Sequence, residues 1–202
     1  DLRLRASVEA FEPGPHGLVA RLSDASRVSC SFALLAAGVR PESSLAREAG
    51  LALGPAGGIQ VDAHMRTSDP SIWAGGDAVE VKDLVREAPA LVPLAGPANR
   101  QGRIAADNVF GRRSRYSGTQ GTAIVKVFGL AFAMTGASEA ALRRGGRAYR
   151  RVYVHPADHA TYYPGAQPIG LQLLFEPDGG RILGAQAGGA GVPCDIPARA
   201  RE

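Results

Sequence analysis

The chain has 202 residues and a formal net charge of +4, with 45% hydrophobic and 21% charged residues. This balance is typical of a globular protein with one large domain or two small ones. No stretch approaches the roughly 18 uncharged apolar residues that a membrane span needs, so we expect no membrane contact. The arginines are scattered rather than interleaved with aromatic residues, which argues against nucleic-acid binding.

Two cysteines and four histidines offer few candidate metal ligands. Cys30 and Cys194 are far apart and form no closely spaced pair. His155 and His159 are four residues apart, but Pro156 opposes the helix that would place them on one face. We therefore predict no metal site and no local redox dithiol. Cys30 is interpreted as a small apolar side chain on the buried face of a strand.

The first half of the chain has the pattern of an α/β fold. Apolar residues alternate over 17–22 and 27–32, which predicts a β-hairpin, and residues 2–8 are also strand-like. The apolar run over 32–37 predicts a strand buried on both faces of a parallel sheet, ended by Gly38. The remaining predicted elements are a helix over 41–49, short strands over 59–61 and 72–74, a helix from Pro97 to about Phe110, and a basic linker over 112–118.

After residue 118 the pattern of predicted strands and one helix indicates an α+β domain of about 80 residues. Ser138 caps a predicted helix that ends at Gly145. The turn over 177–180 predicts a hairpin. The predicted strands are 122–127, 149–154, 169–175 and 182–187.

The sharpest local signal runs from Thr67 to Asp77. A predicted strand delivers the chain to Gly75, Gly76 and Asp77. Two glycines let a ligand approach the backbone, and an aspartate at a strand's carboxyl end can accept hydrogen bonds from ligand hydroxyls. Taken alone, the same three residues also fit an ordinary turn. We predict that they form a corner lining an open cavity.

Several motifs in chain order resemble one family. Thr67–Asp77 looks like the second flavin-binding motif of the two-dinucleotide-domain flavoproteins, in which the counterpart of Asp77 binds the ribityl chain of FAD. Leu34–Pro41 and Gly57–Asp62 resemble the segments that precede this motif. Three further segments, Val92–Gly102, Gly118–Phe128 and His159–Ala166, closely resemble the CoA-disulfide reductases and their NADH oxidase and peroxidase relatives. The resemblance covers residues 1 to about 188.

The resemblance implies an α/β fold, a partial FAD/NAD(P)-binding Rossmann-like region, followed by an α+β dimerisation domain. Residues 1–37 would end an NAD(P)-binding domain and residues 38–117 would be the C-terminal segment of an FAD-binding domain. Residues 118–202 would form the dimerisation domain with an atypical tail. A cytoplasmic homodimer that acts on a small-molecule disulfide is the implied assembly.

The resemblance also implies two sets of site residues. The expected FAD contacts are Gly38, Gly75, Gly76, Asp77, Leu94 and Ala95. The helix that starts near Pro97 would direct its N-terminus at the anionic pyrimidine edge of a reduced flavin, although a plain packing helix fits the sequence as well. One of Tyr162 and Tyr163 would reach the partner subunit's active site, where its hydroxyl could donate a proton to a departing thiolate.

Parts of the family pattern are not found in these residues. The resembled enzymes begin with a Gly-x-Gly-x-x-Gly motif and carry their catalytic cysteine in that same segment. The tail from Gly191 to Pro197 also departs from the family, so Cys194 receives no role. We hypothesise a truncated or frame-shifted gene.

We therefore expect the chain to be a fragment of an FAD- and NAD(P)H-dependent oxidoreductase that reduces CoA disulfide or a related disulfide. We expect the fragment to be inactive by itself. A fragment of an NADH oxidase or peroxidase and a non-catalytic dimerisation module are the alternatives.

Overall fold

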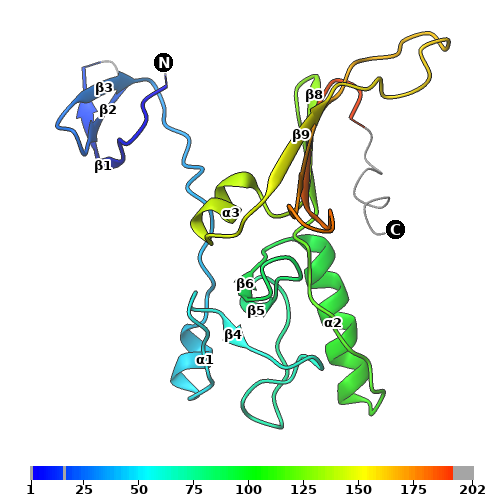
Figure 1. The fold of residues 1–202 in the computed structure, drawn as a ribbon. Helices are drawn as coiled ribbons and strands as arrows, with labels where there is room; N and C mark the ends of the chain where they lie inside the picture. The colour runs from blue at the N-terminus through cyan, green and yellow to red at the C-terminus, as the bar shows by residue number, and fades with distance from the viewer. Residues whose placement is uncertain (1, 16, 193–202) are drawn as a thin grey trace. The chain divides into compact units, whose positions relative to one another are not determined.

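The computed structural model describes residues 2–15 and 17–192. The chain divides into two compact units, residues 1–39 and residues 40–202, which are described one at a time (Figure 1). Within the ranges described, no helix is long and apolar enough to cross a membrane.

The first unit is a three-stranded antiparallel sheet in the order β1-β2-β3. Its strands are β1 (Val8–Gly14), β2 (Gly17–Leu22) and β3 (Arg27–Cys30). The predicted hairpin over 17–22 and 27–32 is confirmed as β2 and β3, whereas β1 begins where the predicted N-terminal strand should have ended. Cys30 is only half-buried, because a sheet of three strands covers little of either face.

The segment from Ser31 to Arg40 forms neither strand nor helix. The predicted strand over 32–37 is therefore wrong: every residue of the run is exposed, and Leu34 keeps 85% of its surface in contact with solvent. A strand needs a neighbour to accept its backbone hydrogen bonds, and no described strand pairs with this segment. Gly38, with a φ of +84°, lies near its end.

The second unit begins with a small α/β layer. Helix α1 (Ser44–Glu48) is shorter than the predicted helix over 41–49, and Gly50 ends it with a φ of +73°. Strands β4 (Ile59–Gln60), β5 (Val79–Lys82) and β6 (Pro89–Leu91) form a sheet in that order. β4 pairs parallel with β5, and β5 pairs antiparallel with β6. The predicted strand over 72–74 is reduced to one bridge between Trp73 and Arg66.

Helix α2 (Ala95–Val109) packs against this sheet. It starts two residues before the predicted Pro97 and ends as predicted, with Phe110 as C-cap and Gly111 at a φ of +80°. The partly buried Ile104 and Ala105 of α2 pack on a core of four buried residues: Met65, Val79, Val81 and Tyr116.

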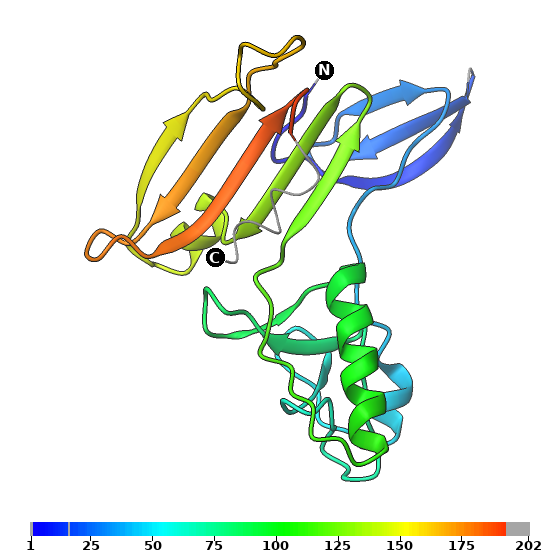
Figure 2. The same cartoon turned by 90° about the vertical axis from the view of Figure 1, so that its right-hand side faces the viewer.

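The rest of the second unit is a five-stranded antiparallel sheet in the order β7-β8-β11-β10-β9, with helix α3 between β8 and β9 (Figure 2). Its elements are β7 (Ala123–Val127), β8 (Leu130–Gly136), α3 (Glu139–Arg144), β9 (Arg150–Val154), β10 (Gly170–Phe175) and β11 (Ile182–Gly189). The cap of α3 is confirmed, because the Ser138 hydroxyl accepts a hydrogen bond from the Ala141 N–H at 3.2 Å. The hairpin of β10 and β11 is confirmed as well.

The basic stretch over 112–118 is anchored at Tyr116, whereas its three arginines are exposed. Tyr116 is only 6% exposed, and its N–H donates to the Ala63 carbonyl at 2.7 Å. Val85, which follows β5, lies in one core cluster with Leu142, Leu174 and Leu183 of the C-terminal sheet and α3. The two layers of the second unit therefore share a core, and the domain boundary near residue 117 stays a prediction from the sequence.

Glu139 is the centre of the polar network that holds α3 on the sheet. Its carboxylate accepts hydrogen bonds from the Tyr149 hydroxyl at 2.7 Å, from Arg151 at 2.6 Å and from Arg143 at 2.5 Å. The hydrogen bonds from Tyr149 and Arg151, the first being the larger effect, lower the pKa of Glu139 to about 2. The ionised carboxylate thus ties the start of α3 to β9.

We predict that Glu139→Gln lowers the midpoint of thermal unfolding at neutral pH, and that the difference shrinks in acid. Because the folded chain lowers the pKa from 4.5 to about 2, the stability from ionised Glu139 is fully present above about pH 4.5. It is lost as the pH falls toward 2. Circular dichroism melts from pH 7 to pH 2 measure this dependence. Glu48→Gln, which removes the same charge from an exposed position, is the control; equal pH profiles for the two variants would contradict the prediction.

Candidate functional site

Gly75, Gly76 and Asp77 form a turn that leads into β5. Gly76 has a φ of +93°, a conformation that residues with a side chain rarely adopt. Asp77 is exposed, so its carboxylate is available to solvent or to a ligand. The chain therefore bends at these residues, although the strand predicted to precede them is reduced to one bridge. The cavity that we predicted beside them stays a prediction.

Gln101 of α2 fixes this corner. Its side chain is 1% exposed, and its Oε1 accepts a hydrogen bond from the Gly76 N–H at 2.8 Å. Gly75 packs on the same residue: a Cβ added to Gly75 would lie 3.3 Å from the Gln101 Cβ. Gln101 was not among the site residues predicted from the sequence. The available signal was a polar residue on the helix face that also carries Ile104 and Ala105.

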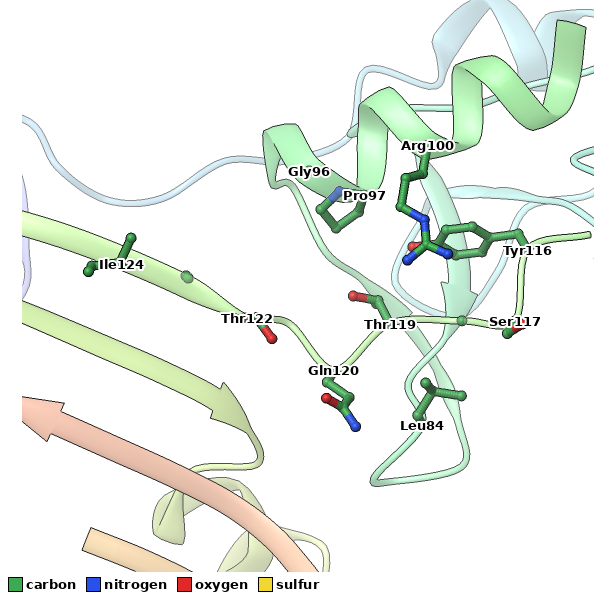
Figure 3. A pocket seen from close by; sticks show the side chains of 12 residues that line it. Leu84, Gly96, Pro97, Arg100, Tyr116, Ser117, Thr119, Gln120, Thr122 and Ile124 are labelled. Carbon is green, nitrogen blue, oxygen red and sulfur yellow. The ribbon is translucent and has the colours of Figure 1, made fainter. Parts of the chain in front are cut away.

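The N-terminus of α2 is open. The N-cap, Leu94, is extended and provides no side-chain hydrogen bond, and the first turn carries no acidic residue. Gly96 is exposed, and Pro97 has no N–H (Figure 3). Unpaired N–H groups and the helix dipole favour a negatively charged group at such an end. Leu94 is half-buried and Ala95 is exposed, roughly two helical turns from the corner at Gln101.

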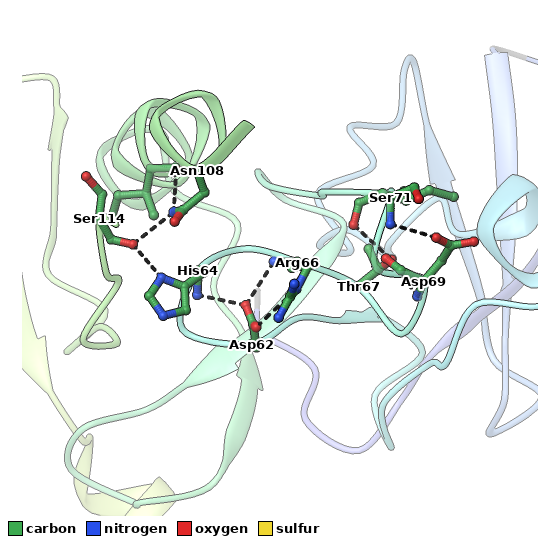
Figure 4. Close-up of polar contacts among 10 residues, drawn as sticks. Asp62, His64, Arg66, Thr67, Asp69, Ser71, Asn108 and Ser114 are labelled. Carbon is green, nitrogen blue, oxygen red and sulfur yellow. Dashed lines mark hydrogen bonds and ion pairs between the residues drawn. The ribbon is translucent and has the colours of Figure 1, made fainter. Parts of the chain in front are cut away.

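Side-chain hydrogen bonds shape the loop that precedes the corner (Figure 4). Asp62 Oδ1 accepts from the N–H groups of His64 and Arg66 at 2.8 and 3.0 Å. His64 Nδ1 lies 2.8 Å from the Ser114 carbonyl oxygen, which also accepts from Asn108 of α2 at 2.8 Å. These contacts tie the loop to the end of α2, so the corner is held from both sides.

Glu80 of β5 is a buried carboxylate that binds backbone N–H groups of the turn before β4. Its Oε1 accepts from the N–H groups of Ala56 and Gly58 at 2.8 and 3.0 Å, and it is 4% exposed. A Cβ on Gly54 would lie 2.0 Å from Glu80 Oε2, so this turn needs glycine. Glu80 therefore anchors the turn over 54–58, which leads into β4.

Tyr162 and Tyr163 lie on the exposed connection between β9 and β10. Their rings are 4.6 Å apart between centroids, and Tyr162 is 81% exposed. Asp158 closes the connection: its Oδ1 accepts from the Gln167 N–H at 2.9 Å and lies 2.8 Å from His159 Nδ1. The bond from Gln167 is the main cause that lowers the pKa of Asp158.

The predicted site residues fall in three places. Gly75, Gly76 and Asp77 form the corner that packs on α2 at Gln101. Leu94 and Ala95 lie at the N-terminal end of the same helix. The connection that carries the tyrosines lies at the end of the five-stranded sheet away from β4, β5 and β6 in both views (Figures 1 and 2). Gly38 belongs to the first unit. Cys194 lies outside the described residues, and within them no group of three or more potential ligands could hold a metal ion.

Comparisons with known proteins show what the chain is similar to. Residues 1–99 match the family described as pyridine nucleotide-disulphide oxidoreductase. The NAD(P)H sulfur oxidoreductase (CoA-dependent) of Pyrococcus abyssi is 31% identical over 95% of this chain and 43% of its own length. An NADH oxidase of Methanocaldococcus jannaschii is 33% identical over 81% of this chain and 36% of its own length. The chain thus spans less than half the length of these curated relatives.

A solved structure has the same fold. The crystal structure of reduced CoADR-RHD from Bacillus anthracis superposes with a TM-score of 0.89 at 46% sequence identity. The match covers 97% of this chain and 35% of that chain.

We predict opposite effects for two glycine-to-alanine changes near the corner. Gly75→Ala places a methyl group against the backbone of α2 and should destabilise folding by about 1 kcal/mol or more. Gly102→Ala, the matched control, meets nothing within 4 Å. It should stabilise α2 by about 0.5–1 kcal/mol. Urea unfolding followed by the fluorescence of Trp73 measures both, and equal effects of the two changes would refute the close packing.

Proposed function

Because the chain belongs to the pyridine nucleotide-disulphide oxidoreductase family, we propose that it supplies the ribityl- and ring-facing part of an FAD site. The enzyme would be an NAD(P)H-dependent oxidoreductase similar to the CoA-disulfide reductases. The observation that carries this proposal is the hydrogen bond from the Gly76 N–H to Gln101, which holds the exposed Asp77 beside α2.

The residues present fit a flavin. A Cβ on Gly76 would meet no atom within 4 Å, so the corner leaves open space at its surface. The exposed carboxylate of Asp77 would accept hydrogen bonds from the ribityl hydroxyls. Leu94 and Ala95 would contact the ring at the open end of α2. Gly38, exposed at a positive φ, belongs to the first unit, and its expected flavin contact stays a prediction from the sequence.

Within this proposal, FAD supplies the transfer of electrons from the nicotinamide nucleotide to the acceptor. The chain supplies binding and electrostatics. Asp77 orients the cofactor, and the N–H groups of the first turn of α2 stabilise negative charge that develops beside them. Gln101 holds Asp77 at a fixed distance from the first turn of α2.

The tyrosine pair favours a disulfide as the acceptor. A hydroxyl of Tyr162 or Tyr163 would donate a proton to the thiolate that leaves when a disulfide is reduced. Both rings are exposed on a connection that Asp158 closes. Since this connection lies away from the flavin corner of its own chain, we place the tyrosines at the site of a partner subunit.

The five-stranded sheet presents a surface suited to that partner. Side chains of β8 alternate: Leu130, Phe132 and Met134 are exposed, whereas the residues between them are buried. Val125 pairs with Phe132 across the strands. A shallow cavity of about 540 Å³ lies on this face beside Phe132 and Tyr153. A contiguous apolar face of this kind favours burial against another protein surface, and we assign it to a homodimer.

We predict that the 202-residue chain binds FAD and riboflavin with similar, weak affinity, with dissociation constants above about 10 µM. These residues carry no Gly-x-Gly-x-x-Gly cradle for the pyrophosphate, so the larger cofactor gains little. Asp77→Ala should weaken both by about tenfold, whereas Asp178→Ala, in an exposed turn, should change neither.

Flavin fluorescence titration measures these affinities. Assays with NADH and CoA disulfide, oxygen or peroxide are expected to show no turnover. Stoichiometric FAD together with turnover of any of these acceptors would overturn the proposal that the chain supplies only part of the site.

We predict that Phe132→Glu shifts the chain from dimer to monomer. The side chain is 48% exposed in one chain, so a charge is tolerated in the monomer but costly once the apolar face is buried. Sedimentation velocity across a concentration series measures the change. Phe128→Glu, at the fully exposed turn between β7 and β8, is the matched control. A dimer that survives Phe132→Glu would contradict this assignment of the interface.

A further inference from the structure

A cavity of about 520 Å³ lies between α2 and the segment that leads from Tyr116 into β7 (Figure 3). Its size is that of a small-molecule site. The lining consists of Leu84, Gly96, Pro97, Arg100, Tyr116, Ser117, Gly118, Thr119, Gln120, Thr122, Ala123 and Ile124. We propose that this cavity binds a phosphate monoester through Arg100 and the Tyr116 hydroxyl.

The charge of the lining is entirely positive. Arg100 is its only charged residue, and no carboxylate lines the cavity. The Arg100 guanidinium lies over the Tyr116 ring, 5.9 Å from its centroid. By contrast, Arg147 in the same unit pairs with Glu176 at 2.6 Å. A guanidinium without a carboxylate, facing a cavity, has the fork of donors that phosphate oxygens accept.

The Tyr116 hydroxyl is a second polar group that the cavity offers to a ligand. Tyr116 is 94% buried, since 6% of its surface is exposed. Among the residues that the structure describes, no atom forms a hydrogen bond with its hydroxyl. Figure 3 shows the ring beside Arg100, with the hydroxyl end directed into the cavity. The hydroxyl oxygen is not among the fully buried atoms that lack a partner in the described residues, so it reaches solvent at the cavity surface and can donate to a bound acceptor.

Other groups around the cavity also act as donors. Gly96 brings the open first turn of α2, whose N–H groups and dipole favour an anion. The Thr119 oxygen already accepts from the Gly121 N–H at 3.1 Å, so its own O–H remains to donate outward. Leu84, Pro97 and Ile124 give the cavity an apolar part. The hydrogen-bond donors suit the phosphate oxygens of a phosphate monoester, and the apolar side chains suit an apolar group esterified to that phosphate.

The side-chain donors of this site are separate from the proposed flavin corner, and only the open first turn of α2 is common to both proposals. Arg100 and Gln101 are consecutive residues of α2, so they point about 100° apart around the helix axis. Gln101 faces Gly76, whereas Arg100 faces the cavity. The proposal therefore does not rest on flavin binding.

The test uses the 202-residue chain without flavin and two probes, phenyl phosphate and benzoate. We expect phenyl phosphate to bind with shifts of the amide signals of Gly96, Thr119 and Thr122 in ¹H–¹⁵N spectra. It should bind at least about tenfold more tightly than benzoate, because the dianion accepts more hydrogen bonds. Inorganic phosphate should shift the same amides at higher concentration.

Three variants decide which groups bind. Arg100→Gln should weaken phenyl phosphate about tenfold or more, and Tyr116→Phe, which keeps the ring, about threefold. Arg103→Gln removes the same charge from an exposed position of α2 outside the cavity, and it should leave the affinity unchanged. Melting curves verify that each variant is folded. No binding, equal binding of benzoate, or equal weakening by Arg103→Gln and Arg100→Gln would each overturn the proposal.

Discussion

The buried amide of Gln101 decides how the rest of the candidate site is arranged. Its Oε1 satisfies the Gly76 N–H at 2.8 Å, while Gly75 packs directly on the helix backbone. The corner and α2 therefore form one rigid piece, and the exposed Asp77 keeps a fixed position relative to the open helix end. A hydrogen bond to a buried polar group specifies geometry more strongly than an apolar contact of the same size.

Helix α2 serves three purposes on three parts of its surface. Ile104 and Ala105 pack on the core around Met65 and Val79. Gln101 holds the glycine corner, and Arg100 faces the donor-lined cavity. This division is possible because consecutive helical residues point in different directions. One helix can thus set the positions of two sites while its apolar residues hold it in place.

The C-terminal sheet depends on contacts with the layer before it. Val85 lies in its core, and Arg147 donates to the Val85 carbonyl and to Glu176. Glu139 then ties α3 to β9. These contacts hold the sheet with its apolar face exposed and its tyrosine-bearing connection away from the glycine corner.

The sequence by itself determined the elements whose signals are local. The hairpin of β2 and β3, the Ser138 cap of α3, the end of α2 at Gly111 and the hairpin of β10 and β11 follow from nearby turn and cap residues. The family resemblance located the corner at Gly75–Asp77. Tertiary structure alone decided the rest, because it depends on partners distant in sequence. Residues 32–37 have no strand to pair with, and the 112–118 stretch is packed through Tyr116. The bond between Gln101 and Gly76 joins residues whose pairing no local pattern encodes.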